Sequence, residues 1–381
     1  MTKREDCSVC SRLDEIKKTL EICNQTHLLQ FYNDLSADER ENYLELLKST
    51  NFVAMNDLFQ EALEVLEEQE NLSGKIIEPV AVSDFGSALT CGQEKIQFYW
   101  NSGLEAISEG KVAALVLSGG QGTRLGLNIP KGMISIELPS GKTIFQVHIE
   151  RIRKLQELAQ KLTKKHGFVP LYILTSETTH KQIEEFLEEN DYFEMGKKNI
   201  ILFRQGMNPC FTLDGKIILS NKDSIAMAPD GTGGLYQAME NNGIFEDLQK
   251  RGVHYVYVYP ADNIMAKVAD PIFVGYCIES KTDCAAKVLK KHKAKQNVGN
   301  ICKVDGFYNL VEYSEISDEL ASRTDDKGEL LFQSGSICIH IFTVNFMKQM
   351  LAKKFRPHVA KKKVPFIDEK GYYVNHHRQM L

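Results

Sequence analysis

The stretch VAALVLSGGQGTRLGLNIPK, residues 112–131, decides the fold. It joins an unbroken apolar run, typical of a strand buried on both faces, to a segment with few side chains. Residues 117–131 hold four glycines, one arginine and one lysine. Glycines after a strand let backbone N–H groups approach an anion without interference from Cβ atoms. The stretch therefore predicts an α/β protein with a phosphate-binding corner after its first sheet strand.

Short apolar runs alternate with helical stretches on both sides of residue 190. The predicted strands are 112–117, 169–175, 200–203 and 253–260, and the predicted helices between them are 144–165 and 179–189. This alternation predicts a Rossmann-like, mostly parallel sheet covered by helices on both faces. Asp305-Gly306 lies between two alternating segments and predicts an added antiparallel hairpin.

Residues 1–105 are predicted to form an N-terminal helical region without strands. Ser36 and Glu39 match a capping box that opens a helix through Leu47, and residues 55–69 have apolar side chains at helical spacing. A coiled-coil arm, the alternative, requires a longer heptad repeat. The α/β core is predicted over 106–350, and 351–381 is predicted to be a short basic tail without a regular element.

Composition narrows the class of protein. The net charge of −5 argues against the broad positive field that nucleic-acid binding requires, although a local basic pocket is allowed. There is no N-terminal apolar segment and no apolar run of bilayer length, so neither nucleic acid nor membrane is an expected partner and a cytoplasmic location is expected. Nine cysteines, an odd number, favour reduced thiols.

A zinc-like spacing occurs near the N-terminus, in Cys7, Cys10, Cys23 and His27. Apolar residues at helical spacing between the two pairs predict that Cys23 and His27 share a helix, while Cys7 and Cys10 lie in a loose terminus. We therefore favour the interpretation without zinc.

Two familiar glycine loops do not fit residues 117–131. The dinucleotide fingerprint needs a small residue where Leu125 stands, which also disfavours a nicotinamide-dependent dehydrogenase. The Walker loop needs a lysine directly after its last glycine, and none follows Gly122 or Gly126. A turn without a ligand remains as the alternative interpretation.

The segment instead resembles the signature of sugar-nucleotide pyrophosphorylases, which are nucleotidyltransferases acting on sugar phosphates. The matching positions are Leu117, Gly120, Gly122, Thr123, Arg124, Leu125, Gly126, Pro130 and Lys131. Segments 204–219, 227–238, 259–275 and 309–317 are similar to those of the eukaryotic-type UDP-N-acetylglucosamine pyrophosphorylases. With the helical region, including 26–35, the resemblance covers nearly the whole chain and implies a GT-A-like catalytic core.

The resemblance implies the reaction of UTP with N-acetylglucosamine 1-phosphate, giving UDP-N-acetylglucosamine and pyrophosphate, with Mg²⁺ as cofactor. Arg124 is expected to grip the β- and γ-phosphates, and Lys131 is expected to meet the α-phosphate. Such transfers depend on alignment and on neutralising charge, so no covalent nucleophile is expected.

The resemblance also assigns binding residues. Those expected to face uracil are Leu117, Ser118, Gly119, Gly120 and Gln205, and those expected to contact the nucleotide are Gly231 and Asp262. Those expected to hold the sugar are Thr232, Gly299, Glu312, Tyr313 and Ser336. Asp262 follows an apolar strand and is the expected Mg²⁺ ligand. By itself, an aspartate in that position is as often a helix cap.

The chain departs from the family pattern in four ways. Ser118 replaces a usual alanine, with little expected effect, while Thr232 and Ser336 replace asparagines expected to touch the amino sugar. UDP-N-acetylgalactosamine and UDP-glucose therefore stay open as products. The resemblance also predicts that the usual C-terminal lobe, with further lysines, is absent, so a weakly active or inactive nucleotide-sugar-binding relative or truncated isoform is an alternative. The sequence contains no signal for oligomeric state.

Overall fold

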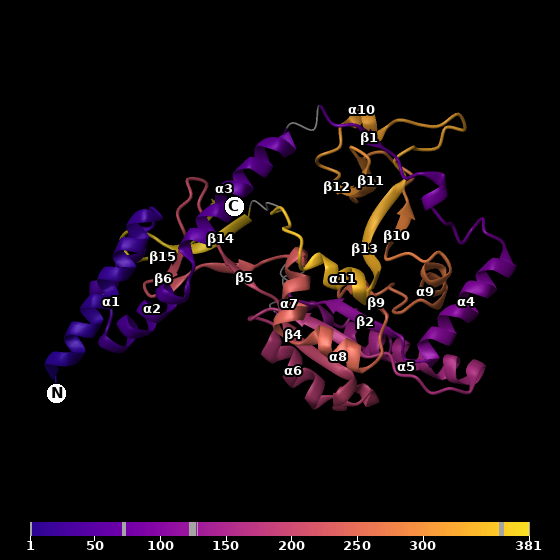
Figure 1. Ribbon diagram of the computed structural model, residues 1–381, viewed down its shortest axis with the longest axis horizontal. Coiled ribbons are helices and arrows are strands. Elements are labelled where there is room, and N and C mark those ends of the chain that lie inside the picture. The colour runs from indigo at the N-terminus through magenta and orange to yellow at the C-terminus, as the bar shows by residue number, and fades with distance from the viewer. Residues whose placement is uncertain (1, 71–73, 122–126, 128, 358–361, 381) are drawn as a thin grey trace. The chain divides into compact units, whose positions relative to one another are not determined.

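A computed structural model describes residues 2–70, 74–121, 127, 129–357 and 362–380. The chain divides into two compact units (Figure 1). The helical unit comprises Met1–Leu72, Met207–Asp230 and Phe355–Leu381, and the sheet unit comprises Ser73–Gly206 and Gly231–Lys354. This division differs from the predicted boundaries at 105 and 350, because the helix before residue 109 packs within the sheet unit.

The sheet unit contains most of the regular structure. Its helices are α4 Gln93–Ser108, α5 Ile144–Thr163, α6 His180–Glu189, α7 Leu235–Asn241, α8 Ile244–Lys250, α9 Pro271–Glu279, α10 Asp318–Ala321 and α11 Val344–Met350. Its strands are β1 Ile77–Glu78, β2 Val112–Leu117, β3 Leu171–Thr175, β4 Ile200–Arg204, β9 Tyr255–Pro260, β10 Cys284–Lys290, β11 Asn300–Val304, β12 Phe307–Val311 and β13 Ser334–Thr343. The four predicted parallel strands and the two predicted helices are confirmed. The expectation of no strand before residue 105 is wrong at β1.

One nine-stranded sheet organises this unit, in the order β1-β11-β13-β9-β2-β3-β4, with β10 beside β13 and β12 beside β11. The strands β9, β2, β3 and β4 run parallel, which confirms the predicted core. β13 is antiparallel to β9 and begins the antiparallel half. The predicted hairpin is confirmed, since Val304 pairs with Phe307 around Asp305-Gly306, both with positive φ.

Alternate residues of the parallel strands build two apolar layers. On β2, Ala114 and Val116 face a core formed with α4, α5, α6 and α9. Ala113 and Leu115 face the opposite core, formed with α7, α8 and α11. All four side chains are fully buried, which explains the unbroken apolar run in the sequence.

The helices α4 and α9 lie side by side at very close range (Figure 1). A Cβ atom on Gly275 would lie 1.9 Å from the Tyr99 carbonyl oxygen, and one on Gly103 would lie 2.0 Å from the Pro271 carbonyl oxygen. Glycine is therefore required at both positions, and α4 belongs to the sheet unit.

The helical unit combines three distant segments of the chain. Its helices are α1 Thr2–Ile22, α2 Ala37–Ser49 and α3 Phe52–Glu70, and its strands are β5 Met207–Pro209, β6 Leu219–Asn221, β7 Ser224–Ile225, β8 Met227–Pro229, β14 Lys362–Ile367 and β15 Tyr373–Met380. The predicted capping box of Ser36 and Glu39 is confirmed at the start of α2. The buried Gln25 side chain joins the segments, since its Nε2 donates to the Gly215 carbonyl at 2.8 Å and its Oε1 accepts from Ile217 N at 2.9 Å.

The C-terminal segment forms the antiparallel hairpin of β14 and β15, so the prediction of a tail without regular structure is wrong. Phe366 packs against Cys210 and Ile218 of the same unit. Asp368 closes the turn by accepting from the backbone N–H groups of Lys370 and Tyr372. Pro365 lies at the register shift between Val364 and Phe366, and a proline within a short apolar run argues against a strand, so the sequence did not predict β14.

The predicted arrangement of the zinc-like residues is also wrong. Cys7 and Cys10 belong to α1, and Cys23 follows that helix as a buried free thiol. His27 lies on a separate 3₁₀ turn, where its Nε2 is 2.7 Å from the Ile217 carbonyl oxygen. The favoured interpretation without zinc stays a prediction.

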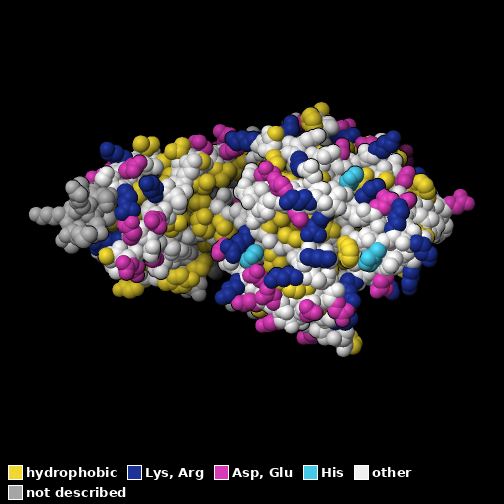
Figure 2. Space-filling view, turned by 60° about the horizontal axis from the view of Figure 1, so that its bottom comes forward, with side chains coloured by type: hydrophobic (Ala, Val, Ile, Leu, Met, Phe, Trp, Pro, Cys, Tyr) yellow, Lys and Arg dark blue, Asp and Glu magenta, His cyan; other side chains and the backbone are white. Residues whose placement is uncertain are grey.

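The distribution of charge on the surface and the composition of the helices bear on possible partners. Figure 2 shows Lys and Arg side chains interspersed with Asp and Glu over the displayed face. Within the described ranges, no helix combines the length and the apolar content needed to cross a bilayer.

Candidate active site

The parallel strands end at one common edge of the sheet, where parallel α/β sheets bind their ligands. Three hydrogen bonds align the residues that follow. Ser118 N donates to Leu174 O at 2.9 Å, Gln205 N donates to Thr175 O at 2.9 Å, and Ala261 N donates to Leu117 O at 3.1 Å. The backbone after β2 is thus fixed between the ends of its two neighbours.

The glycine corner, residues 117–120 together with Gln205, lies at this edge. A Cβ atom on Gly119 would lie 2.7 Å from Gln205 Nε2, so the amide lies directly against the backbone of Gly119. Ser118 is buried and Gly120 is exposed. The structure therefore brings together the five residues that the resemblance assigned to uracil.

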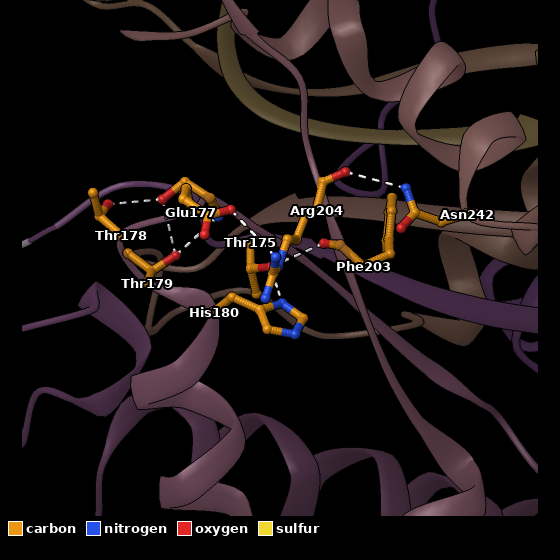
Figure 3. A network of polar contacts seen from close by, with 9 residues as sticks. Thr175, Glu177, Thr178, Thr179, His180, Phe203, Arg204 and Asn242 are labelled. Atoms are coloured by element: carbon orange, nitrogen blue, oxygen red, sulfur yellow. Dashed lines mark hydrogen bonds and ion pairs between the residues drawn. The ribbon is translucent and has the colours of Figure 1, made fainter. Parts of the chain in front are cut away.

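A polar network supports the corner from the ends of β3 and β4 (Figure 3). The hydroxyl of Thr179 donates to the Ser118 carbonyl at 3.4 Å. Thr175 Oγ1 donates to the Phe203 carbonyl at 3.0 Å and lies 2.8 Å from Nδ1 of His180. Burial, together with the charge of Arg204, lowers the pKa of His180. The sequence analysis missed this network, because its residues resemble an ordinary helix start.

On the outer side of the corner, Arg204 Nη1 lies 3.3 Å from a Glu177 carboxylate oxygen, and Asn242 Nδ2 donates to the Arg204 carbonyl at 3.2 Å (Figure 3). These contacts tie the end of β4 to both α7 and the loop after β3. The backbone at Gln205 is therefore held by two hydrogen bonds, one from its own N–H to Thr175 and one from Asn242 to the carbonyl of Arg204.

Lys131 and Asp262 form the charged pair of the site. Lys131 Nζ lies 2.6 Å from Asp262 Oδ2, with side-chain exposures of 32% and 51%. Lys131 N contacts Gly120 O at 3.5 Å, which places the pair beside the glycine corner. The helix-cap alternative for Asp262 is wrong, since the next helix, α9, is capped by Asp270. Arg124, the other predicted catalytic residue, lies outside the described residues.

A second group, the hairpin cluster of Gly299, Glu312 and Ser336, lies on the antiparallel half of the sheet. Ser336 N donates to Gly299 O at 2.8 Å, and a Cβ atom on Gly299 would lie 3.3 Å from Glu312 Oε2. The adjacent Tyr313 is 51% exposed. Three of the predicted sugar residues are therefore neighbours, and Tyr313 flanks them.

Gly231 and Thr232 are exposed at the turn before α7. Gly231 has φ 79°, a conformation that favours glycine. The contacts of the described residues do not join these two positions to the hairpin cluster, so their predicted roles stay predictions.

Cys338 is a site residue that the sequence analysis missed. It has φ 56° and lies on β13 beside the register shift in the pairing with β10. Burial, and further the carboxylates of Glu312 and Asp262, raise the pKa of its thiol. Its backbone N–H donates to the Ser336 hydroxyl at 3.4 Å, so Cys338 lies beside the hairpin cluster.

Among the described residues, no group of three or more His, Cys, Asp or Glu side chains is arranged to hold a metal ion. Mg²⁺ does not require such a group, because it commonly takes one or two carboxylates together with phosphate oxygens and water. The half-exposed carboxylate of Asp262, beside the glycine corner, fits that donor set.

A parallel sheet with a glycine corner at its ligand-binding edge defines an α/β nucleotide-binding protein. The chain belongs to the UDPGP family, whose model, described as UTP–glucose-1-phosphate uridylyltransferase, matches residues 52–375. UDP-N-acetylhexosamine pyrophosphorylase-like protein 1 of Mus musculus is 42% identical over 368 residues, which are 94% of this chain and 72% of that protein.

Two further relatives extend the comparison. UDP-N-acetylglucosamine diphosphorylase 2 of Arabidopsis thaliana is 35% identical over 355 residues, covering 90% of this chain and 70% of that protein. The crystal structure of the Trypanosoma brucei uridine diphosphate N-acetylglucosamine pyrophosphorylase, in complex with inhibitor, aligns with a TM-score of 0.80 and 31% identity, over 95% of this chain and 72% of that one. The predicted family resemblance and fold class are confirmed.

Proposed function

We propose that the chain is a uridylyltransferase that joins UTP and N-acetylglucosamine 1-phosphate to give UDP-N-acetylglucosamine and pyrophosphate. The observation that carries the proposal is the 2.6 Å pair of Lys131 and Asp262 beside the Gly119–Gln205 contact. Relatives named for this activity cover most of the chain, as the Arabidopsis thaliana diphosphorylase does. Binding of a uridine alone would not demand a lysine and a carboxylate at the phosphate end of the corner.

The glycine corner binds the nucleotide through its backbone. A flat base lies against Gly119 and Gly120, and the Gln205 amide offers both a donor and an acceptor to its edge. Because Gln205 is held against Gly119, the amide is oriented before the nucleotide arrives. Preorganised polar groups lower the cost of ordering on binding.

In the reaction, a phosphate oxygen of the sugar 1-phosphate attacks the α-phosphorus of UTP. One O–P bond forms, the bond to the bridging oxygen of the β-phosphate breaks, and pyrophosphate leaves. Lys131 supplies positive charge to the α-phosphate oxygens as their charge increases, and Arg124 retains its predicted role on the leaving phosphates. A side-chain nucleophile has no part in this route.

Asp262 is the residue of this chain that would hold Mg²⁺. The ion, when bound, neutralises phosphate charge and orients the phosphate chain. Without ligands, Lys131 and Asp262 satisfy each other. Each group holds the other in place before the substrate enters. Phosphate oxygens would compete for the Lys131 ammonium, and the Asp262 carboxylate would then be available to hold the ion.

The hairpin cluster is the proposed sugar site, with Glu312 accepting from sugar hydroxyls. Ser336 offers a hydroxyl where an asparagine amide was expected from the resemblance, and Thr232 does the same in its turn. A hydroxyl reaches less far than an amide, so we propose N-acetylglucosamine 1-phosphate as the principal but not exclusive substrate. A cytoplasmic location belongs to the same proposal, since free thiols such as Cys23 suit a reducing compartment.

The test is incubation of the full chain with UTP, Mg²⁺ and a panel of sugar 1-phosphates, followed by a pyrophosphate assay. The panel contains N-acetylglucosamine, N-acetylgalactosamine and glucose 1-phosphates. Pyrophosphate release with the first as best substrate supports the proposal. Calorimetric binding of UDP-N-acetylglucosamine without any turnover would replace it with a non-catalytic nucleotide-sugar-binding protein.

A further inference from the structure

Helix α5 contacts both loops that carry the charged pair. At its first turn, the buried Phe145 ring covers Gly132, the residue after Lys131. A Cβ atom on Gly132 would lie 2.3 Å from this ring, so the contact is as close as the backbone allows. Ile144 N also donates to Ile134 O at 3.1 Å. The beginning of α5 therefore fixes the turn that presents Lys131.

One turn further along α5, His148 reaches the other loop. The side chain is fully buried, and its Nε2 lies 3.2 Å from the carbonyl oxygen of Asn263, the residue after Asp262. A carbonyl accepts only, so this contact assigns the proton to Nε2. The imidazole packs edge-on against Tyr259 of β9, with ring centroids 5.1 Å apart.

Arg151, on the next turn, holds the same loop at two more points. Its Nη1 donates to the carbonyl of Ile264 and, at 2.9 Å, to the carbonyl of Ala266. The loop is itself a tight turn, since Ala266 N donates to Asn263 O at 3.0 Å. Three carbonyls after Asp262 therefore accept hydrogen bonds from two side chains of one helix.

We propose that His148 and Arg151 are positioning residues, which hold Asp262 at the correct distance from Lys131 for catalysis. The inference rests on the proposed function and deepens it. Phe145, His148 and Arg151 are spaced by three residues and lie on one helical face. The two members of the charged pair, far apart in the sequence, are therefore set against one rigid element, which is how a site keeps reacting groups aligned.

The test compares His148→Phe with His148→Gln and with the matched control Ile152→Val. Phenylalanine keeps the ring packing and removes the Nε2 donor, whereas the glutamine amide can replace that donor. Ile152 is fully buried on the same helix and belongs to the apolar core. The shortened side chain should lower stability but removes none of the hydrogen bonds that hold either loop. Arg151→Met, at a half-buried position, is a second variant in case His148→Phe fails to fold.

The first readout is hydrogen exchange of residues 263–266, which does not depend on activity. We expect exchange at least about 10-fold faster in His148→Phe and Arg151→Met, and near wild-type exchange in His148→Gln and Ile152→Val. Unchanged exchange in both of the first two variants, or an equal increase in the control, would overturn the proposal.

The second readout is steady-state kinetics. We expect kcat to fall about 10- to 100-fold in His148→Phe, because small misplacements of catalytic groups have effects of that size. The Mg²⁺ concentration for half-maximal rate should rise, the KM for the sugar 1-phosphate should not change, and His148→Gln should recover most of the rate. A rise in that KM with unchanged kcat contradicts the positioning role. If wild-type protein forms no UDP-sugar, the proposed function fails, and the exchange result alone decides whether α5 holds the loop.

Discussion

The glycine corner and the hairpin cluster differ in what they offer a ligand. The corner consists mostly of backbone at the end of buried parallel strands, and Ser118 within it is 1% exposed. The hairpin cluster presents side chains on the antiparallel half of the sheet, beside the exposed Leu310. A site made of backbone depends on glycine where the chain approaches its neighbours closely, whereas a site made of side chains depends on the polar groups that each side chain offers. The four predictions below test this difference, from the largest expected effect to the smallest.

Lys131→Ala should have the largest effect, a loss of turnover of at least about 100-fold, which is the scale for removing one preorganised charge donor. The KM for the sugar 1-phosphate should change little, because the hairpin cluster is not touched. Steady-state kinetics with UTP and N-acetylglucosamine 1-phosphate measure both. Near wild-type turnover would remove Lys131 from the mechanism.

Acid should destabilise the protein through His148. Burial, together with the Arg151 charge and against the Asn263 hydrogen bond, lowers the pKa of His148 from 6.5 to about 4. The unfolded chain therefore binds a proton at a higher pH than the folded chain does. The stability that the neutral side chain contributes is complete above about pH 6.5 and falls by up to about 3 kcal/mol as the pH decreases towards 4.

Urea unfolding at pH 7 and pH 4.5 measures this difference. In His148→Gln, the loss of stability between the two pH values should be smaller than in wild type. The control is His166→Gln, at an exposed position, which should keep the full loss. Equal losses in the two variants would show that His148 is not the responsible group.

Gly119→Ala should raise the KM for UTP about 10-fold, the effect expected from losing one or two oriented hydrogen bonds. The new methyl group would lie 2.7 Å from the Gln205 amide, a flexible side chain that moves aside while the fold stays intact. Gly74→Ala is the matched control outside the site, because a Cβ atom on this exposed glycine would meet no heavy atom within 4 Å. If both variants raise the KM equally, the Gln205 contact is not part of the nucleotide site.

Ser336→Asn should have the smallest effect, a several-fold increase in kcat/KM for N-acetylglucosamine 1-phosphate relative to glucose 1-phosphate. An amide reaches further than the hydroxyl and can bond to the acetamido group, which glucose lacks. The KM for UTP is the internal control and should stay constant. No change in the ratio between the two sugars would separate Ser336 from sugar selection.

The sequence predicted the parallel core and the corner because both follow from local rules. The apolar run before Leu117 requires burial on two faces, and the glycines after it require close approach of backbone. The sequence predicted a role for Lys131 and a role for Asp262, but it did not predict that the two side chains form an ion pair. The sequence places these residues far apart, and the contact depends on β9 lying next to β2.

The remaining features depend on contacts between segments that carry no shared pattern. Residues 207–230 join the N-terminal helical segment through several polar contacts, among them those of Gln25, His27 and Lys216. The β14–β15 hairpin could be predicted only by identifying a turn at Asp368, and the basic residues before it suggested a solvated tail instead. His148 and Arg151 face carbonyl oxygens, and a carbonyl has no signature in a sequence. Such residues were found only from the structure.

The most direct test of the account is the melting temperature of the full chain with Mg²⁺ and either UTP or ATP at the same concentration. Ligands that bind only the folded state stabilise it in proportion to the logarithm of their concentration. We predict a rise of several degrees with UTP, a smaller rise with UTP in Gly119→Ala, and no comparable rise with ATP. Equal melting temperatures with UTP, with ATP and without nucleotide would contradict a uridine triphosphate site at the glycine corner.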